Sequence, residues 1–463
     1  MKLPADGNHR GDGKMIRSDA ISTLEAELNS TDAAVRRQAV EQLAERFRSG
    51  EAKCAPESSD HNMHCHTCYS YNGYGYSPSY IAYLARKNGW FAAGIVDFDV
   101  LDALDEFLFA AEKLNVRASG GVESRTFIQE LAGEEINSPG EPGIAYHLGL
   151  GFSVSDVPPS QQLFLLEMRR QAHRRTRGIA ALVNEHLTPA ELDFTADAVR
   201  LTPNANVTER HLCQAYREKA EQRFPAPEAR AAFWADKLGT TPEKAASLIN
   251  SPVELEAAIR SKTMKKGGVG YVAPRPESFP PIDRMNSFIA ASGAIPTIAW
   301  LNGLSSGESD PDRLLDLHIS KGAAMLNIVP DRNWNVSDPE KQKKLIEELD
   351  RIIEACRERD LPIVVGTEMN APGLKLVDDF SQPALARHLE LFVDGAALLS
   401  AHTLLGHLGR GYLSEWAKNN FSDTAAKNRF FSRFGRLVTP EKFHAIHAWP
   451  GAPEEMLALA GNR

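Results

Sequence analysis

Hydrophobic and polar positions change their spacing several times along the chain, and these changes predict its elements. From residue 18 to about 55, apolar residues such as Leu24, Leu28, Val40 and Leu43 recur every three or four positions, as they do on one face of a helix. We therefore expect two helices that pack as a hairpin, preceded by a polar and glycine-bearing leader.

From residue 60 the pattern changes to short apolar runs that alternate with amphipathic segments. This alternation predicts a parallel-stranded α/β body, and a barrel is the expected way for the sheet to close. A charge- and alanine-rich helical stretch interrupts it. The predicted strands are one that holds His64 and His66, followed by 91–98, 118–127, 144–152, 294–301, 324–329 and 361–369.

The predicted parts of the chain follow from these changes of pattern. They are a flexible leader (1–17), an N-terminal helical hairpin (18–55), a barrel (60–158 and 286–374), a helical insertion (159–285) and a C-terminal helical extension (375–463).

Composition narrows the possible partners. The 463 residues are 43% hydrophobic and carry a formal net charge of −9, which argues against binding to nucleic acid or to an anionic membrane surface. The sequence shows no apolar run of the roughly 20 residues that a membrane helix requires. Five scattered cysteines favour a reducing compartment, so we expect a cytoplasmic protein. A small anionic substrate stays compatible with this charge, because a metal ion sets its own local field.

His64 and His66 are the first candidate chemistry. Side chains alternate along a strand, so the two imidazoles point to the same face and can share one metal ion. The alternative is a pair of half-buried histidines with a structural role only. Polar residues at the ends of several other predicted strands favour the metal, because buried strands have no structural reason to end this way repeatedly. These residues are Asp97, Asp99, Glu123, His147, Glu368 and Asn370.

The motifs that contain these residues resemble those of the PHP (polymerase and histidinol phosphatase) family of metal-dependent phosphoesterases. The family's Asp-Leu-His-x-His-Thr is similar to residues 62–67, its Thr-Asp-His-Asp to 96–99, its Gly-x-Glu to 121–123, its His-Ile-Leu-Gly-Leu to 147–151, its Gly-Ser-Asp-x-His to 366–370, and the Val-Thr-Arg-x-His of its insertion-containing members to 207–211.

This resemblance implies a distorted (β/α)7 barrel and a divalent metal ion, Zn, Mn or Fe, since mixed histidine and carboxylate ligands suit all three. It implies that one ion is held by His64, His66, Glu123 and Glu368, and that a second would use Glu123 and His147. The chain departs from the family at Phe98, Trp300 and Asn370, each in the place of a histidine. We therefore expect a reduced site, with one well-formed metal position.

Three further residues are assigned roles around that ion. Asp97 is predicted to act in catalysis, either by orienting a ligand imidazole or by accepting a proton from the metal-bound water. Arg125 lies two residues beyond Glu123 and is predicted to face the site and bind a phosphate group. Asn370 is the second predicted substrate-binding residue.

The leading hypothesis is a metal-dependent hydrolase that cleaves a small phosphate ester with a metal-activated water. Loss of ligands at Phe98, Trp300 and Asn370 keeps two alternatives open. One is a catalytically degenerate domain that binds a metal or ligand without turnover. The other is a mononuclear, amidohydrolase-like enzyme that acts on a substrate without phosphate.

Overall fold

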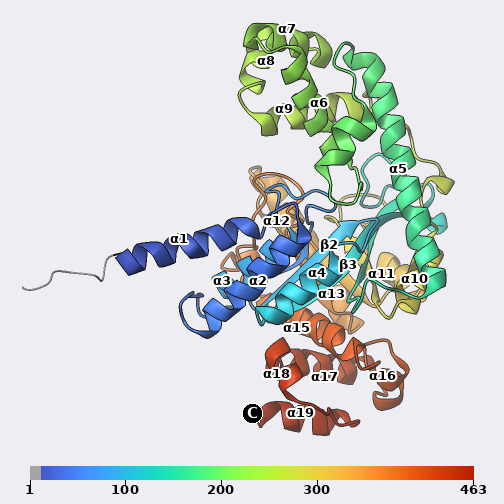
Figure 1. Ribbon diagram of the computed structural model, residues 1–463. Helices are drawn as coiled ribbons and strands as arrows, with labels where there is room; N and C mark the ends of the chain where they lie inside the picture. Colours follow the sequence, from blue (N-terminus) through green and yellow to red (C-terminus); the bar gives the residue numbers. More distant parts are fainter. Residues whose placement is uncertain (1–11, 463) are drawn as a thin grey trace, which may run out of the picture.

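A computed structural model describes residues 12–462, and it has a strand-bearing body with helical parts at its side and at both ends (Figure 1). Residues 1–11 of the predicted leader lie outside the described part. Helix α1 (Asp12–Glu27) begins before residue 18, so the hairpin that it forms with α2 (Ala33–Arg48) is longer than expected. This hairpin packs mainly through α2, against the barrel helices α3 (Pro78–Asn88) and α4 (Leu104–Lys113).

The body is a seven-stranded sheet in the order β1 to β7. It is nearly closed into a barrel, as predicted, because the chain beyond β7 pairs with β1 through an isolated bridge between Cys65 and Glu368. The Glu368 N–H donates to the His64 carbonyl at 2.8 Å, and the His66 N–H donates to the Glu368 carbonyl at 2.7 Å. The strands are β1 (His61–Cys65), β2 (Ala92–Phe98), β3 (Arg117–Phe127), β4 (Ile144–Leu150), β5 (Ile295–Trp300), β6 (Met325–Ile328) and β7 (Ile363–Val365).

The prediction of an all-parallel sheet is wrong for one strand. β4 is antiparallel to both β3 and β5. The connection from β3 to β4 contains only the short 3-10 turn η1 (Gln129–Leu131), whereas a parallel crossover usually contains an α-helix that packs on the sheet. The chain therefore turns back, and the C-terminal end of β4 points to the opposite end of the barrel.

Helices on the outside of the barrel follow the sequence signals closely. In α3 the Ser77 side chain caps the first turn by accepting from the Tyr80 N–H, Pro78 stands at the first helical position, and Gly89 ends the helix with a left-handed backbone at φ 67°. Glycine adopts that conformation without strain. The other helices against the strands are α10 (Ile282–Ala291), α11 (Pro311–Ser320), α12 (Asp331–Trp334) and α13 (Pro339–Glu358).

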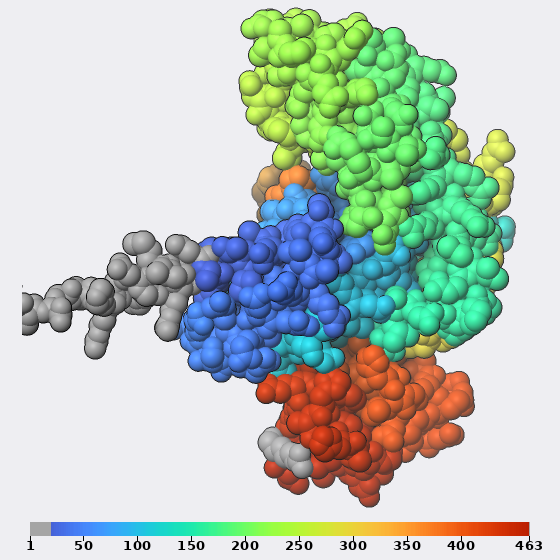
Figure 2. All heavy atoms as spheres, in the orientation of Figure 1, coloured from blue at the N-terminus to red at the C-terminus, as the bar shows by residue number. Residues whose placement is uncertain are grey.

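The helical stretch that interrupts the strands has a core of its own. Helix α5 (Pro159–Leu187) packs on the barrel side through Phe164 and Met168 and contributes Val183 and Leu187 to the second core. Helices α6 (Glu209–Arg223), α7 (Pro227–Leu238), α8 (Pro242–Leu248) and α9 (Pro252–Ile259) lie beyond one end of the barrel (Figures 1 and 2). The short elements of the same stretch are η2 (Phe194–Ala198), η3 (Val199–Leu201), η4 (Arg260–Met264) and η5 (Pro276–Ser278).

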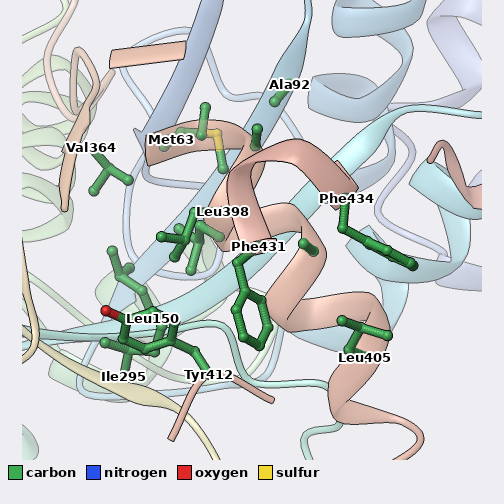
Figure 3. Close-up of a cluster of buried hydrophobic side chains, with 14 of the residues drawn as sticks. Met63, Ala92, Leu150, Ile295, Val364, Leu398, Leu405, Tyr412, Phe431 and Phe434 are labelled. Carbon is green, nitrogen blue, oxygen red and sulfur yellow. The ribbon is translucent and has the colours of Figure 1, made fainter. Parts of the chain in front are cut away.

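The C-terminal helices close the opposite end of the barrel. Helix α15 (Leu389–Gly406) packs with α17 (Thr424–Leu437) against residues near the starts of strands, including Ala92 and Ile295 (Figure 3). Among the described residues α15 alone is long and apolar enough to cross a membrane, but 67% of it is buried inside the protein. The other helices here are α14 (Pro383–Ala386), α16 (Glu415–Asn420), α18 (Pro440–Ala445) and α19 (Pro453–Gly461).

Candidate metal centre

His64 and His66 lie at the C-terminal end of β1. The pairing of β1 with β2 shifts its register between Asn62 and Cys65. Such an irregularity bends a strand locally. Both side chains are buried, at 1% and 0% exposure, and their ring centroids lie 5.5 Å apart. The structure thus brings the two imidazoles together, as the alternation along β1 predicted.

Glu123 on β3 completes a group of three buried donor atoms. Its Oε2 lies 3.0 Å from Nε2 of His66 and 3.6 Å from Nε2 of His64, and all three atoms lie within 4.8 Å of one another. None of them has a hydrogen-bond partner among the described residues. Atoms bound tetrahedrally to one ion at about 2.0–2.2 Å stand about 3.4 Å apart. The spacing and the unsatisfied lone pairs therefore fit a divalent metal ion.

The His64 ring is held by an amide on the facing strand. Nδ1 of His64 lies 2.8 Å from Oδ1 of Asn327 on β6. An amide oxygen only accepts hydrogen bonds, so Nδ1 carries the proton and donates it. In the neutral ring this leaves Nε2 as a bare acceptor directed at Glu123, as a metal ligand requires.

The His66 ring is held through a chain of two side chains. Nδ1 of His66 lies 3.0 Å from Oγ of Ser70, and the Ser70 hydroxyl donates to Oδ1 of Asp97. Because the Ser70 proton goes to Asp97, the Ser70 oxygen accepts from Nδ1 of His66. Asp97 also accepts from the N–H and the hydroxyl of Thr67, at 2.9 and 2.7 Å.

This arrangement corrects one of the two roles predicted for Asp97. Its carboxylate is 2% exposed and is fully engaged by Thr67 and Ser70, away from the cavity above the histidines. A base that accepts a proton from bound water must reach that water. The hydrogen bonds are compatible with the other predicted role of Asp97, the orientation of His66 through Ser70, and that role stays a prediction.

The electrostatics of the group favour a bound cation. Burial raises the pKa of Glu123, but the two adjacent histidines outweigh burial and hold that pKa well below its usual range. Burial lowers the pKa of His64, yet Glu123 and then Glu368 raise it above its ordinary value overall. The carboxylate is thus ionised, and the field that stabilises a proton on His64 also stabilises a metal ion.

Glu368 lies at the same cavity but not in the compact group. Its Oε2 is 2.7 Å from the Arg332 guanidinium and accepts from the Asn370 amide at 2.7 Å. Its backbone has φ 63°, uncommon for a residue with a Cβ. That Glu368 binds the metal stays a prediction. To do so, its carboxylate would have to give up the ion pair with Arg332 and bind the metal ion in its place. Asn370 lines the cavity, and its predicted contact with substrate is likewise untested.

The prediction of His147 as a metal ligand is wrong, because the register in which β4 pairs with β3 turns its side chain away from Glu123. In the β3–β4 pairing, His147 stands opposite Ser124 while Glu123 stands opposite Leu148. His147 and Glu123 therefore face opposite sides of the sheet. The His147 ring bonds to Asn286 at 2.6 Å and stacks on His318. Burial lowers its pKa to about 4, so it is neutral.

Two positions at which the PHP motifs carry histidine are occupied by aromatic residues in this chain. The Phe98 ring lies against His66, with centroids 4.2 Å apart. Trp300 is buried in the hydrophobic cluster of β5, β6 and α13 at 3% exposure. Within residues 12–462, the His64–His66–Glu123 group is the one set of three histidine, cysteine or carboxylate residues that stands close enough for a metal ion.

A cavity of about 500 Å³ opens above the metal group, between the barrel and the helical insertion. Arg125 points into it, as predicted, and forms an ion pair with Glu141 at 2.9 Å. Its guanidinium also stacks over the Phe279 ring. The cavity falls within the usual range for small-molecule sites.

Sequence reasoning missed several residues of this site. Asn327 had a usable signal, because it is the polar residue of the otherwise apolar strand Met325–Ile328. Ser70 had none, since it belongs to a polar turn of ordinary composition. The lining side chains Tyr71, Tyr146, Arg175, Arg210 and Arg332 come together only through the fold.

Comparisons with known proteins give distant likenesses of the fold. No family model matches this chain, and no curated protein does. An amidohydrolase from Chromobacterium violaceum, solved with sulfate and no metal, is 17% identical with a TM-score of 0.47, over 72% of this chain and 96% of that one. A Bifidobacterium adolescentis protein named as a metal-dependent phosphoesterase is 17% identical with a TM-score of 0.44, over 73% and 98%. At this level of likeness, function rests on the residues of this chain.

Proposed function

We propose that this chain is a metal-dependent hydrolase of the PHP type that acts on a small phosphate ester. One divalent ion would be held by His64, His66 and Glu123, with Glu368 as a further ligand once it leaves Arg332. The observation that carries the proposal is the convergence of three buried, unpartnered donor atoms on one point.

Bound there, a divalent ion would supply Lewis acidity and a water of lowered pKa. The residues of the chain orient the ligands, balance the charge of the ion and exclude water. Asn327 and Ser70 fix which nitrogen each imidazole presents. Glu123 supplies the negative charge that balances the cation. Phe98 covers one side of His66 and keeps bulk water from that ring.

The cavity supports an anionic substrate. Arg125 and Arg175 both line it, and each guanidinium lies over the Phe279 ring. Guanidinium groups bind phosphate oxygens through paired hydrogen bonds. Cations of this kind beside a metal centre suit the charge that a phosphoryl group bears during transfer.

One observation favours a second candidate. Phe98 fills space beside His66, and the described residues offer a single group of three metal donors. A single ion lacks the two-metal clamp that stabilises both oxygens of an in-line phosphoryl displacement. Hydrolysis of a carboxylic ester or amide is therefore the alternative substrate chemistry for the same site.

The test is an activity screen on the full chain loaded with Mn or Zn, with phosphate monoesters and with carboxylic esters and amides. We expect phosphate release, lowered by about a hundredfold or more in kcat/KM by Glu123→Gln, since several kcal/mol of charge stabilisation are lost. The control is Glu130→Gln, on a surface carboxylate that pairs with Lys321. Turnover of carboxylic substrates alone would select the second candidate, and phosphate release that survives Glu123→Gln would contradict both.

A further inference from the structure

The side chain of Asn206 joins the helical insertion to two backbone segments of the barrel. Asn206 lies between η3 and α6, in residues 204–208, called here the junction turn, and is 2% exposed. Its Nδ2 donates to the Phe98 carbonyl at 2.8 Å and to the Tyr69 carbonyl at 3.2 Å. Phe98 ends β2, and Tyr69 belongs to the loop after β1. One amide from the insertion therefore holds two separate strand connections together.

Both carbonyls stand next to groups that hold the His66 ring. The Tyr69 carbonyl is part of the peptide bond to Ser70, whose hydroxyl oxygen lies 3.0 Å from Nδ1 of His66. The Phe98 carbonyl belongs to the residue whose ring packs against His66, with centroids 4.2 Å apart. Movement of either segment would therefore move a contact of the His66 ring.

Helix α5 fixes the junction turn. Ala205 has φ 60°, a backbone conformation that is uncommon for a residue with a Cβ and persists where surrounding contacts hold it. The Ala205 carbonyl accepts from Nε2 of His173, and the Asn204 carbonyl accepts from Arg169. Both donors stand on α5, which also packs on the barrel side. The place of the Asn206 amide is therefore set by how the insertion packs on the barrel.

Loss of the Asn206 amide would release both segments. Each carbonyl would lose a donor in a buried place, which costs free energy unless the backbone shifts to another partner. The loop of Tyr69 would carry Ser70 with it, and the end of β2 would carry Phe98. The His66 ring would then present its Nε2 less precisely, and misplacement of a ligand atom weakens metal binding even where the chain stays folded.

We propose that Asn206 is a positioning residue for the metal group, which couples the packing of the insertion on the barrel to the affinity of His66 for the metal ion. This inference deepens the proposed function and rests on its metal site, but not on the class of substrate that is cleaved. Coupling of this kind is reciprocal. The insertion strengthens metal binding, and the bound metal stabilises the insertion in its place by the same factor.

The first experiment measures metal affinity of the full chain by competition with a chelator, and the visible absorption of the Co²⁺ form, which reports ligand geometry. We expect Asn206→Ala to weaken metal binding about tenfold, as loss of an outer-shell partner does, and to change the Co²⁺ spectrum. The matched control is Asn184→Ala, because Asn184 bonds to Leu192 and Tyr216 within the insertion. It should change neither the affinity nor the spectrum.

The second experiment uses the unchanged chain, so it requires no variant to fold. Amide hydrogen exchange is compared with and without metal. We expect the metal to slow exchange in the junction turn as well as in the loop 67–76, because the coupling is reciprocal. Helices α7 and α8 are the internal control, since they lie at the end of the insertion away from the barrel (Figure 1), and their exchange should stay the same.

The outcomes separate this inference from the proposed function. The coupling would be overturned by equal metal affinity of Asn206→Ala and the unchanged chain, by an equal loss in Asn184→Ala, or by exchange in the junction turn that does not respond to metal. Each of these results leaves the proposed function standing. Weakened metal binding by Asn206→Ala, in a chain that hydrolyses none of the substrates tested, would support the coupling and remove the proposed function.

Discussion

At the scale of single residues, two hydrogen bonds decide what the paired histidines can bind. Asn327 accepts a hydrogen bond from Nδ1 of His64, and Ser70 accepts one from Nδ1 of His66. The Nε2 atoms of both rings are thereby directed at Glu123. A histidine that binds metal almost always donates its other N–H in this way. The supporting bonds are therefore as informative about function as the ligands.

The first prediction concerns Ser70, which connects His66 with Asp97. Ser70→Ala removes the acceptor for Nδ1 of His66, so we expect metal affinity to fall about 10- to 100-fold. Affinity is measured by competition with a chelator of known strength. The matched control is Ser124→Ala, also buried and next to Glu123 but bonded to Asp99. An equal loss in both variants would mean that His66 needs no orientation by Ser70.

A second prediction concerns the buried carboxyl of Asp378, which is 3% exposed. Burial, followed by the nearby Asp331, raises the pKa of Asp378 from 3.8 to about 8. Between those pH values the folded chain holds a proton that the unfolded chain has released. The free energy of unfolding therefore decreases as pH rises through this window and levels off above it.

Asp378→Asn removes this dependence, because the amide stays neutral at every pH. We expect the variant to be more stable than the unchanged chain by about 2 kcal/mol at pH 9, with the difference shrinking toward pH 4. Urea unfolding at several pH values measures it. A variant that is destabilised equally at pH 5 and pH 9 would show that Asp378 is ionised in the folded protein.

At the scale of elements, the N-terminal hairpin is tied to the barrel by one buried arginine. Nε of Arg36 on α2 donates to Glu106 on α4 at 2.8 Å, and another guanidinium nitrogen donates to the Ser30 carbonyl at 2.7 Å. The same side chain reaches the Tyr69 hydroxyl. Since Tyr69 stands next to Ser70, this contact connects the hairpin with the turn that holds His66.

The third prediction follows from this anchor. Arg36→Gln leaves Glu106 partly buried without its cation, so we expect a loss of about 3 kcal/mol in the free energy of unfolding. Arg48→Gln, on the same helix but in an exposed pair with Glu45, should change stability by about 0.5 kcal/mol or less. Urea denaturation compares the two. Equal stability of both variants would show that the hairpin does not depend on Arg36.

The elements also show which signals in the sequence were sufficient to predict the bounds of a helix or strand, and which were not. Helix α3 was predictable to within a residue, because Ser77, Pro78 and Gly89 are local signals for a start and an end. Strand β4 was located correctly from its apolar run, but its direction depends on the connection before it. The error at His147 came from the register of β4 against β3, which sets the face that a residue presents and does not follow from a period-two pattern.

At the scale of the whole molecule, the candidate site lies between two bodies with separate cores. The barrel supplies His64, His66 and Glu123, and the insertion supplies residues 206–210, 260 and 265 of the cavity lining. The metal group could be predicted because His64 and His66 lie at the end of β1 and Glu123 lies on β3 of the same barrel. The pairing of Glu368 with Arg332 could not be predicted, because it depends on a contact between distant segments of the chain.

The central claim is that His64, His66 and Glu123 hold one divalent ion, and metal content per chain tests it most directly. Protein purified without chelator is analysed by elemental analysis beside His66→Gln and Glu123→Gln, with His444→Ala as control because that histidine is half exposed and far from the group. We predict about one equivalent of metal, retained in the control and lost in both other variants. No metal after reconstitution, or the same content in every variant, would contradict the account.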